Sequence, residues 1–298
     1  FGALTHGLEG EQLSELVALR DVGCVAFTQG LAPMKSNRIL RRALEYAAGF
    51  DVPVVFMPQD PEMAQGGSAH EGPTAARMGL VGIPETAETI ALARDLLLVE
   101  QTGVQAHFSG LSSARAMDML ADAQARGLRV TADVAMYQLL LCDEDLDGFS
   151  SLLHVLPPLR SSADRRALRQ AVQSGVVQAI SSHHQPHEQE AKRVPFAASA
   201  PGISSIEVLL PLAMTLVADG LLELPALLAR LTCGPAGALG LPAGTLAQGA
   251  RADITLFDPV EASLIGHNWI SKGANCPFIG QGVPCKVTHT ICKLVYQA

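Results

Sequence analysis

The sequence predicts an α/β fold, built on a parallel sheet with helices packed outside it and followed by a small β module. Short, apolar, β-branched stretches alternate with amphipathic helical patterns over the first two-thirds of the 298 residues. This alternation is typical of a parallel sheet covered by helices. Hydrophobic residues make up 48% and charged residues 17% of the chain, so we expect a sizeable buried core rather than disorder.

Strands and helices can be assigned in order from their apolar periodicity and the turn residues that bound them. The predicted strands are Cys24–Thr28, Pro53–Met57, Val104–Phe108, Arg129–Val134 and Val176–Ser181. The predicted helices between them are Asn37–Ala48, Pro84–Gln101, Ser113–Ala125 and Ser162–Gln173. Ser113 and Ser162 are expected helix N-caps, because a short hydroxyl can satisfy the first unpaired backbone N–H groups.

Five βα units are visible, whereas a closed (β/α)8 barrel of the TIM type needs eight. Two arrangements remain open: an open doubly wound sheet, or a barrel with about three further units upstream. An open five-stranded remnant would expose sheet edges. The chain also opens at Phe1, without a methionine, and enters a folded pattern almost at once. These features favour the barrel with its N-terminal strands missing.

The pattern changes in the last third of the chain. Helices are predicted at Ile206–Ala218 and Pro225–Leu231, and short strands at Asp253–Phe257 and Val287–Tyr296. Loops rich in Gly and Pro separate these strands, and no helical pattern accompanies them. We therefore divide the chain into a barrel portion, 1–243, and a C-terminal β module, 244–298.

Charge and cysteine content exclude some classes of function. The formal net charge is -8 and no basic run is present, so we expect no nucleic-acid partner. No apolar run reaches the length of a membrane span, and we expect no signal peptide before the first strand. The six cysteines form no C-x-x-C pair, so they are expected to be reduced, mostly buried thiols of a cytoplasmic protein.

Short motifs follow one another along nearly the whole chain. They include Gly23–Phe27 (GCVAF), Asp60–Gly72, Gly127–Val134 (GLRVTADV), Pro157–Arg160 (PPLR), Gly249–Pro259 (GARADITLFDP) and Ser271–Asn275 (SKGAN). Each motif is weak alone, but their collinear order resembles the dihydroorotases of the cyclic amidohydrolase family. The resemblance implies a metal-dependent (β/α)8 barrel of pyrimidine biosynthesis and a composite β-sandwich built from both chain ends. It also implies that the family's His-x-His metal motif lies upstream of Phe1.

The same resemblance indicates where metal ligands should lie after the first three visible strands. The acidic ligand after the first strand is replaced in the segment that contains Gln29. The histidine after the second strand is Met57, and the histidine after the third is Gly110. A thioether is a soft, weak ligand that does not replace imidazole on zinc. His107, inside the third strand, matches a family residue that is not a ligand.

The remaining site positions are also altered. Where the family has Pro-His-His, this chain has Met-Tyr-Gln, and the ring of Tyr137 is expected to fill the pocket. Leu156 replaces the substrate-side asparagine, and His183 replaces the catalytic aspartate. The base that activates water is therefore expected to be absent. These substitutions predict a vestigial pocket without a metal or other cofactor.

A cluster of His183, His184 and His187 is the one feature that suggests a metal site. Adjacent histidines point in different directions, so at most two of the three are expected to converge. A loop of hydrogen-bonded or solvent-facing histidines is the favoured interpretation. Arg160 is likewise expected to hold its loop, and Asp60 and Glu71 to cap a helix or fix a loop.

Three functional hypotheses follow from the resemblance. The first is a pseudoenzyme, a non-catalytic dihydroorotase-like protein that acts as a structural partner of aspartate carbamoyltransferase in a hetero-oligomer, with self-association possible. The second is an active cyclic amidohydrolase, of dihydroorotase or hydantoinase type, whose rearranged zinc site uses the histidine cluster and upstream residues. The third is a barrel that binds a pyrimidine intermediate without turning it over.

Overall fold

A computed structural model describes residues 1–266 and 269–292 of the chain. Its central sheet has six strands in the order β1-β2-β3-β6-β7-β8, and every neighbouring pair is parallel. The strands are β1 (Gly2–Ala3), β2 (Phe27–Thr28), β3 (Val54–Phe56), β6 (Ala106–Phe108), β7 (Val130–Ala135) and β8 (Ala179–Ser181). All five predicted strands are present. The prediction of five units missed β1, because two small residues carry no β-branched or alternating signal.

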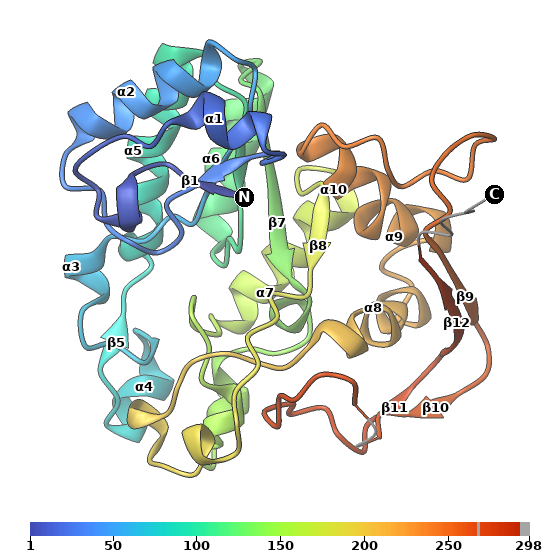
Figure 1. The fold of residues 1–298 in the computed structure, drawn as a ribbon. Coiled ribbons are helices and arrows are strands. Elements are labelled where there is room, and N and C mark those ends of the chain that lie inside the picture. Colours follow the sequence, from blue (N-terminus) through green and yellow to red (C-terminus); the bar gives the residue numbers. More distant parts are fainter. Residues whose placement is uncertain (267–268, 293–298) are drawn as a thin grey trace.

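Helices alternate with these strands along the chain. They are α1 (Leu16–Asp21), α2 (Asn37–Ala48), α5 (Thr86–Thr102), α6 (Ala114–Ala125) and α7 (Ser162–Ser174). Figure 1 shows α1, α2, α5 and α6 gathered on one side of the sheet, far from the C-terminal strands. One hydrophobic core joins their apolar faces to strand residues such as Phe27, Val54 and Phe108.

The helix N-caps follow local hydrogen bonding. Ser113 Oγ accepts from the N–H of Ala116, which confirms its predicted capping role. The N-cap of α7 is Ser161, so the prediction of Ser162 was one residue late. Ser161 and Asp164 form a reciprocal capping box, and only Ser161 stands three residues before that carboxylate.

A small insertion separates β3 from α5. It contains α3 (Pro61–Ala64), α4 (Pro73–Met78) and a parallel pair of short strands, β4 (Ala69–His70) and β5 (Gly82–Ile83). Single turns of 3-10 helix lie in the loops, at His6–Leu8, Met136–Leu139, Asp143–Leu146, Ser151–Leu153, Glu190–Lys192, Phe196–Ala198 and Ile206–Val208. The later helices are α8 (Leu209–Ala218), α9 (Leu224–Leu231) and α10 (Cys233–Ala238).

The C-terminal region forms two antiparallel strand pairs. Strand β9 (Ile254–Asp258) pairs with β12 (Lys286–Ile291), and β10 (Ser263–Leu264) pairs with β11 (Gly282–Val283). The described part of 244–298 contains no helix, as predicted. The predicted strand Val287–Tyr296 corresponds to β12, although its last residues, from 293 on, lie outside the described residues. The domain division at 243/244 stays a prediction.

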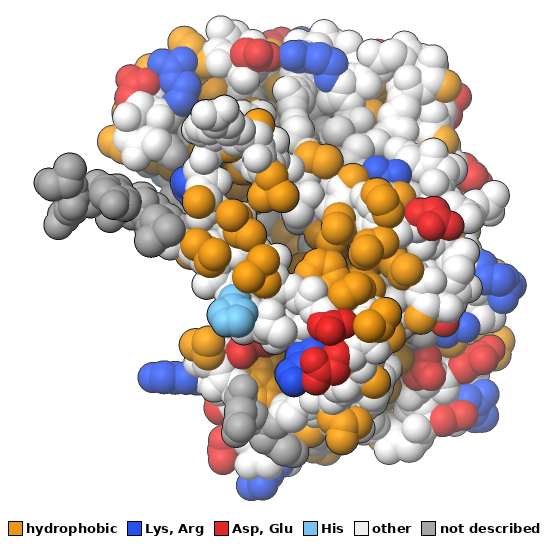
Figure 2. Space-filling view, turned by 90° about the vertical axis from the view of Figure 1, so that its right-hand side faces the viewer, with side chains coloured by type: hydrophobic (Ala, Val, Ile, Leu, Met, Phe, Trp, Pro, Cys, Tyr) orange, Lys and Arg blue, Asp and Glu red, His pale blue; other side chains and the backbone are white. Residues whose placement is uncertain are grey.

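Apolar side chains gather on the face that carries these C-terminal strands, as Figure 2 shows. Exposed members of the module include Leu256, Val260, Leu264 and Val287. Apolar residues scattered singly over a surface would not form such a group. Within the described residues, no helix has both the length and the apolar character needed to cross a membrane.

All six cysteines are free thiols. Cys142, Cys276 and Cys285 are buried, whereas Cys233 and Cys292 are exposed. The expectation that the thiols are mostly buried is therefore wrong for the C-terminal third, where two of them reach solvent.

Candidate functional site

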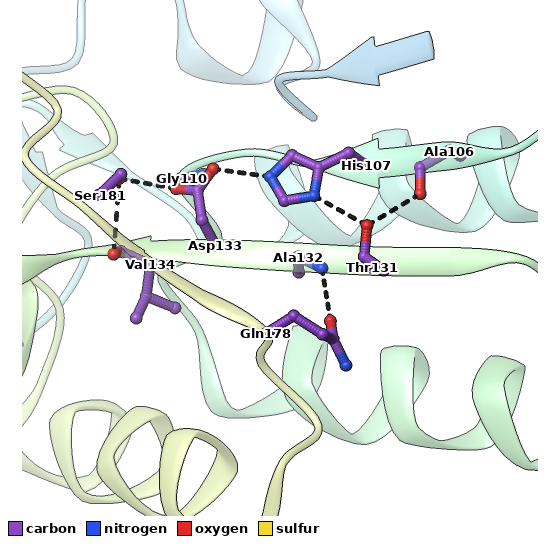
Figure 3. A network of polar contacts seen from close by, with 9 residues as sticks. All are labelled: Ala106, His107, Gly110, Thr131, Ala132, Asp133, Val134, Gln178 and Ser181. Carbon is purple, nitrogen blue, oxygen red and sulfur yellow. Dashed lines mark hydrogen bonds and ion pairs between the residues drawn. The ribbon is translucent and has the colours of Figure 1, made fainter. Parts of the chain in front are cut away.

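Polar side chains from β6, β7 and β8 meet on one face of the sheet (Figure 3). His107 on β6 contacts Thr131 Oγ1 through Nδ1 at 2.8 Å and Asp133 Oδ2 through Nε2 at 3.0 Å. Asp133 Oδ1 accepts from the N–H of Gly110 at 3.1 Å and from Ser181 Oγ at 2.7 Å. The carboxylate of Asp133 thus ties three neighbouring strands together.

Asp133 is buried, and its environment determines its charge. Burial alone raises the pKa of this carboxyl, but hydrogen bonds from His107, Ser181 and Ser109 outweigh it and hold the pKa below its ordinary value. The carboxylate is therefore ionised at neutral pH. Because both of its oxygens already accept hydrogen bonds, we interpret Asp133 as a structural anchor rather than as a free base.

Three of the predicted pocket residues, Gly110, Tyr137 and His183, lie together next to this network. The hydroxyl of Tyr137 and Nδ1 of His183 are 2.9 Å apart. Burial raises the pKa of Tyr137 and lowers the pKa of His183, so both side chains are neutral at pH 7. The two neutral groups therefore share one hydrogen bond, in which the tautomer of the imidazole decides whether the phenol donates or accepts.

Gly110 lies next to the His183 ring. A Cβ added at Gly110 would lie 3.4 Å from Nε2 of His183. Gly110 also has φ +71°, a left-handed conformation that glycine adopts without strain. The backbone of His183 is left-handed as well, with φ 45°. The left-handed backbone, rather than a lack of space beside His183, therefore favours glycine at 110.

Gln29 and Met57 do not join this group. The amide of Gln29 is buried and accepts from Thr5 Oγ1 at 2.9 Å, while its Nε2 donates to the carbonyl of Leu8 at 2.8 Å. Met57 is half-buried and lines a separate cavity with Gln29. Leu156 packs against a small cluster formed by Ala64, Ile83 and Ala87.

The three histidines of the predicted cluster each have their own partners. Nδ1 of His184 accepts from the N–H groups of Ser205 at 3.0 Å and Ile206 at 3.2 Å. Nε2 of His187 contacts the carbonyl of Pro201 at 3.0 Å. Over residues 1–266 and 269–292, no three His, Cys, Asp or Glu side chains gather in a way that could hold a metal ion.

The sequence reasoning missed Asn275, which is buried and fixes the histidine loop. Its Oδ1 accepts from the N–H of His187 at 2.8 Å, and its Nδ2 donates to the carbonyls of Gln185 and Gly202, each at 2.9 Å. Asn275 lies in the SKGAN motif and Asp133 in GLRVTADV. The two motifs were therefore the only indication of these residues in the sequence, and neither motif indicates which distant residues Asn275 and Asp133 contact.

Arg160 holds its loop, as expected. The buried guanidinium donates to Ser112 Oγ, to the carbonyl of Ile83 and to Nδ1 of His70, at 3.0 to 3.1 Å. Ser112 in turn donates to the buried carboxylate of Glu88.

The two expected loop carboxylates differ. Asp60 caps α3 by accepting from the N–H groups of Glu62 and Met63, as predicted. For Glu71, the contact observed is made by the backbone, whose N–H donates to the carbonyl of Ile83 at 3.0 Å.

Comparison with known proteins identifies relatives at two levels. The amidohydrolase family pattern matches residues 63–293, and the dihydro-orotase-like pattern matches residues 1–116. A dihydroorotase-like protein of Pseudomonas aeruginosa is 68% identical over 290 residues, which cover 97% of this chain and 69% of that protein. A dihydroorotase of Syntrophus aciditrophicus is 40% identical over 298 residues, covering 99% of this chain and 70% of that protein.

Solved structures agree on the fold. An L-hydantoinase from Arthrobacter aurescens superimposes with a TM-score of 0.82 at 21% identity, covering 97% of this chain and 67% of the hydantoinase. At this identity the likeness establishes the fold alone, and it confirms the predicted barrel type. With the sequence relatives, it shows that this chain belongs to the amidohydrolase family, among its dihydroorotase-like proteins.

Proposed function

We propose that this chain is a non-catalytic, dihydroorotase-like protein. The observation that carries the proposal is the hydrogen bond between Tyr137 and His183. From the resemblance to the dihydroorotases, a catalytic aspartate would be expected at the position of His183 and a Pro-His-His segment around Tyr137. Here both side chains are neutral and are bonded to each other.

The chemistry of ring opening supports the proposal. Hydrolysis of a cyclic amide at neutral pH requires activated water, which this family obtains from a metal ion and a general base. A neutral phenol, an imidazole whose Nδ1 is already bonded, and a glycine do not fit a zinc site. Asp133 is ionised, but its oxygens accept from His107, Ser181 and Gly110.

The zinc content of the purified full-length protein tests this part of the proposal. We expect well below one equivalent of zinc per chain after incubation with zinc and removal of the excess. One tightly held equivalent would contradict the proposal. In that case His183→Ala would show whether the vestigial pocket supplies a ligand.

An active enzyme is the alternative, and one observation favours it: relatives about 40% identical to this chain are named dihydroorotases. Such an enzyme would be a cyclic amidohydrolase of dihydroorotase or hydantoinase type. It would use His184 or His187 with ligands from outside this chain, which spans 69% of the Pseudomonas aeruginosa relative. His184 and His187 would first have to release their partners in the histidine loop.

We further propose aspartate carbamoyltransferase as the partner, in the cytoplasm, where the six thiols stay reduced. The apolar face in Figure 2 supports a protein contact, and so does the C-terminal module, in which Val260 and Leu264 are 84% and 73% exposed. Co-elution of the full-length protein with purified aspartate carbamoyltransferase tests the partner. Elution of the two proteins at their separate volumes, or as a dihydroorotase-like homo-oligomer alone, would contradict it.

A further inference from the structure

A cavity of about 80 Å³ lies outside the group formed by Gly110, Tyr137 and His183. Its walls come from the loop after β2, the segment 55–57 at the end of β3, and helix α5. Leu4, Leu40 and Phe56 belong to the apolar part of the walls, and Arg94 and Asp95 belong to the polar part and supply charge.

Asp95 is the unusual member of this lining, because its side chain is only 2% exposed and only one of its oxygens is bonded. Arg94 approaches Oδ1 with both Nε and Nη2 at 2.8 Å. No contact in the described part of the chain engages Oδ2. Among the described side-chain N and O atoms, only Ser68 Oγ is both sealed from solvent and unpaired. Asp95 Oδ2 is therefore accessible to solvent. Because Asp95 is one of the residues that line the cavity, we infer that Oδ2 faces the cavity.

The electrostatics of the pair restrict what can bind. Burial raises the pKa of Asp95 to about 6, while the adjacent Arg94 lowers it in part, so the carboxylate is largely ionised at pH 7. An ionised oxygen with little solvent needs a hydrogen-bond donor. Arg94 would repel a bound cation and Asp95 would repel a bound anion, and both repulsions are strong in a poorly solvated site. A neutral donor avoids both repulsions.

The guanidinium offers the complementary half of the site. The Arg94 side chain is 34% exposed, and its Nη1 takes no part in the pair with Asp95. A neutral group with N–H for Asp95 and C=O for Arg94 satisfies both. Primary amides and ureido groups have this pairing. The apolar walls accept a short alkyl group, and the volume excludes drug-sized molecules, which need about 300 Å³ or more.

We propose that this cavity binds a small neutral molecule carrying a primary amide or ureido group, held between Asp95 and Arg94. Gln29 and Met57, two residues of the predicted vestigial pocket, line this cavity, whereas Gly110, Tyr137 and His183 do not. The inference therefore does not depend on the Tyr137–His183 pair that carries the non-catalytic proposal.

Methionine methyl groups provide a direct test, because Met34 and Met57 line the cavity. Met117 and Met136 are buried elsewhere and serve as internal controls. The protein, labelled with 13C-methyl methionine, is titrated with isobutyramide. Isobutyrate and isobutylammonium carry the same branched alkyl group with a negative or a positive charge. We expect isobutyramide to shift the Met34 and Met57 signals saturably and the charged compounds to leave them in place.

Two variants localise the binding. Asp95→Asn removes the anionic acceptor, and we expect the amide to bind at least about tenfold more weakly. Ala32→Phe places a ring at the cavity wall and is expected to abolish the shifts, while Ala32→Ser preserves them. Unmoved Met34 and Met57 signals up to the solubility of the amide would overturn the proposal. So would equal shifts with all three compounds, or unchanged binding in both Asp95→Asn and Ala32→Phe.

Discussion

The hydrogen bond between Tyr137 and His183 makes a quantitative prediction about stability. Tyr137→Phe removes one hydroxyl and keeps the ring that fills the pocket. Nδ1 of His183 is then left without its hydrogen-bond partner in a half-buried site, which costs about 1–3 kcal/mol of the free energy of unfolding. His183→Gly removes the imidazole that bonds the Tyr137 hydroxyl, and glycine adopts the left-handed backbone at 183, where φ is 45°, without strain.

The double variant distinguishes a real interaction from two independent losses. When both partners are removed, neither buried group remains unsatisfied. Tyr137→Phe combined with His183→Gly should therefore be less destabilised than the sum of the single variants, by about 1 kcal/mol. Urea unfolding, with the midpoint and slope compared across all four proteins, measures this difference.

Tyr46→Phe is the matched control. Tyr46 is half-buried on α2 and packs edge-on against Phe50, a contact that phenylalanine preserves. We expect a change within about 0.5 kcal/mol for this variant. A Tyr137→Phe effect as small as that of the control, or strict additivity in the double variant, would refute the idea that the pair closes the pocket.

Three further predictions concern buried polar groups. Asn275→Ala breaks three hydrogen bonds to the histidine loop and should cost about 2–4 kcal/mol in urea unfolding; a cost below about 1 kcal/mol would show that the loop is held otherwise. The Glu88 carboxylate accepts hydrogen bonds from Ser112 and Ser113, and Glu88→Gln places an amide donor opposite one of these donors. We expect this variant to lose about 2 kcal/mol of the free energy of unfolding, and no change would contradict the arrangement. Burial lowers the pKa of His183 and His154, so the unfolded chain binds more protons, and stability should fall as pH drops below the unfolded value of 6.5. The pKa of Asp95 is raised from 3.8 to about 6, so between those values the folded chain binds more protons at this carboxyl, and its stability increases as pH falls. Asp95→Asn removes this contribution, so the variant should lose stability more steeply in acid. An unchanged pH profile would contradict this prediction.

Local patterns predicted most of the fold. Helix α2 begins and ends at the predicted residues, because Ser36 caps it and its apolar periodicity is strong. The predicted strands correspond to β2, β3, β6, β7 and β8, because each has a short apolar run bounded by turn residues. Strand β1 could not be predicted from Gly2 and Ala3, since only pairing with β2 defines it.

The candidate site shows the same division between local and long-range information. The resemblance brought Gly110, Tyr137 and His183 to one place, where the structure also has them together. Gln29 turned out to belong elsewhere, because its amide is held by Thr5 and Leu8 at the end of β1, an element that the prediction lacked. The partners of Asp133 and Asn275 come from distant parts of the chain, and no local pattern specifies them.

Turnover of dihydroorotate by the full-length protein, measured with added zinc, tests the central claim most directly. The dihydroorotase of Syntrophus aciditrophicus, assayed in parallel, gives the reference for a relative named as an enzyme. The Tyr137–His183 pair predicts no hydrolysis above the zinc-only background at any zinc concentration. Zinc-dependent hydrolysis that disappears in a His184→Ala, His187→Ala variant would contradict the non-catalytic proposal and move the active site to the histidine loop.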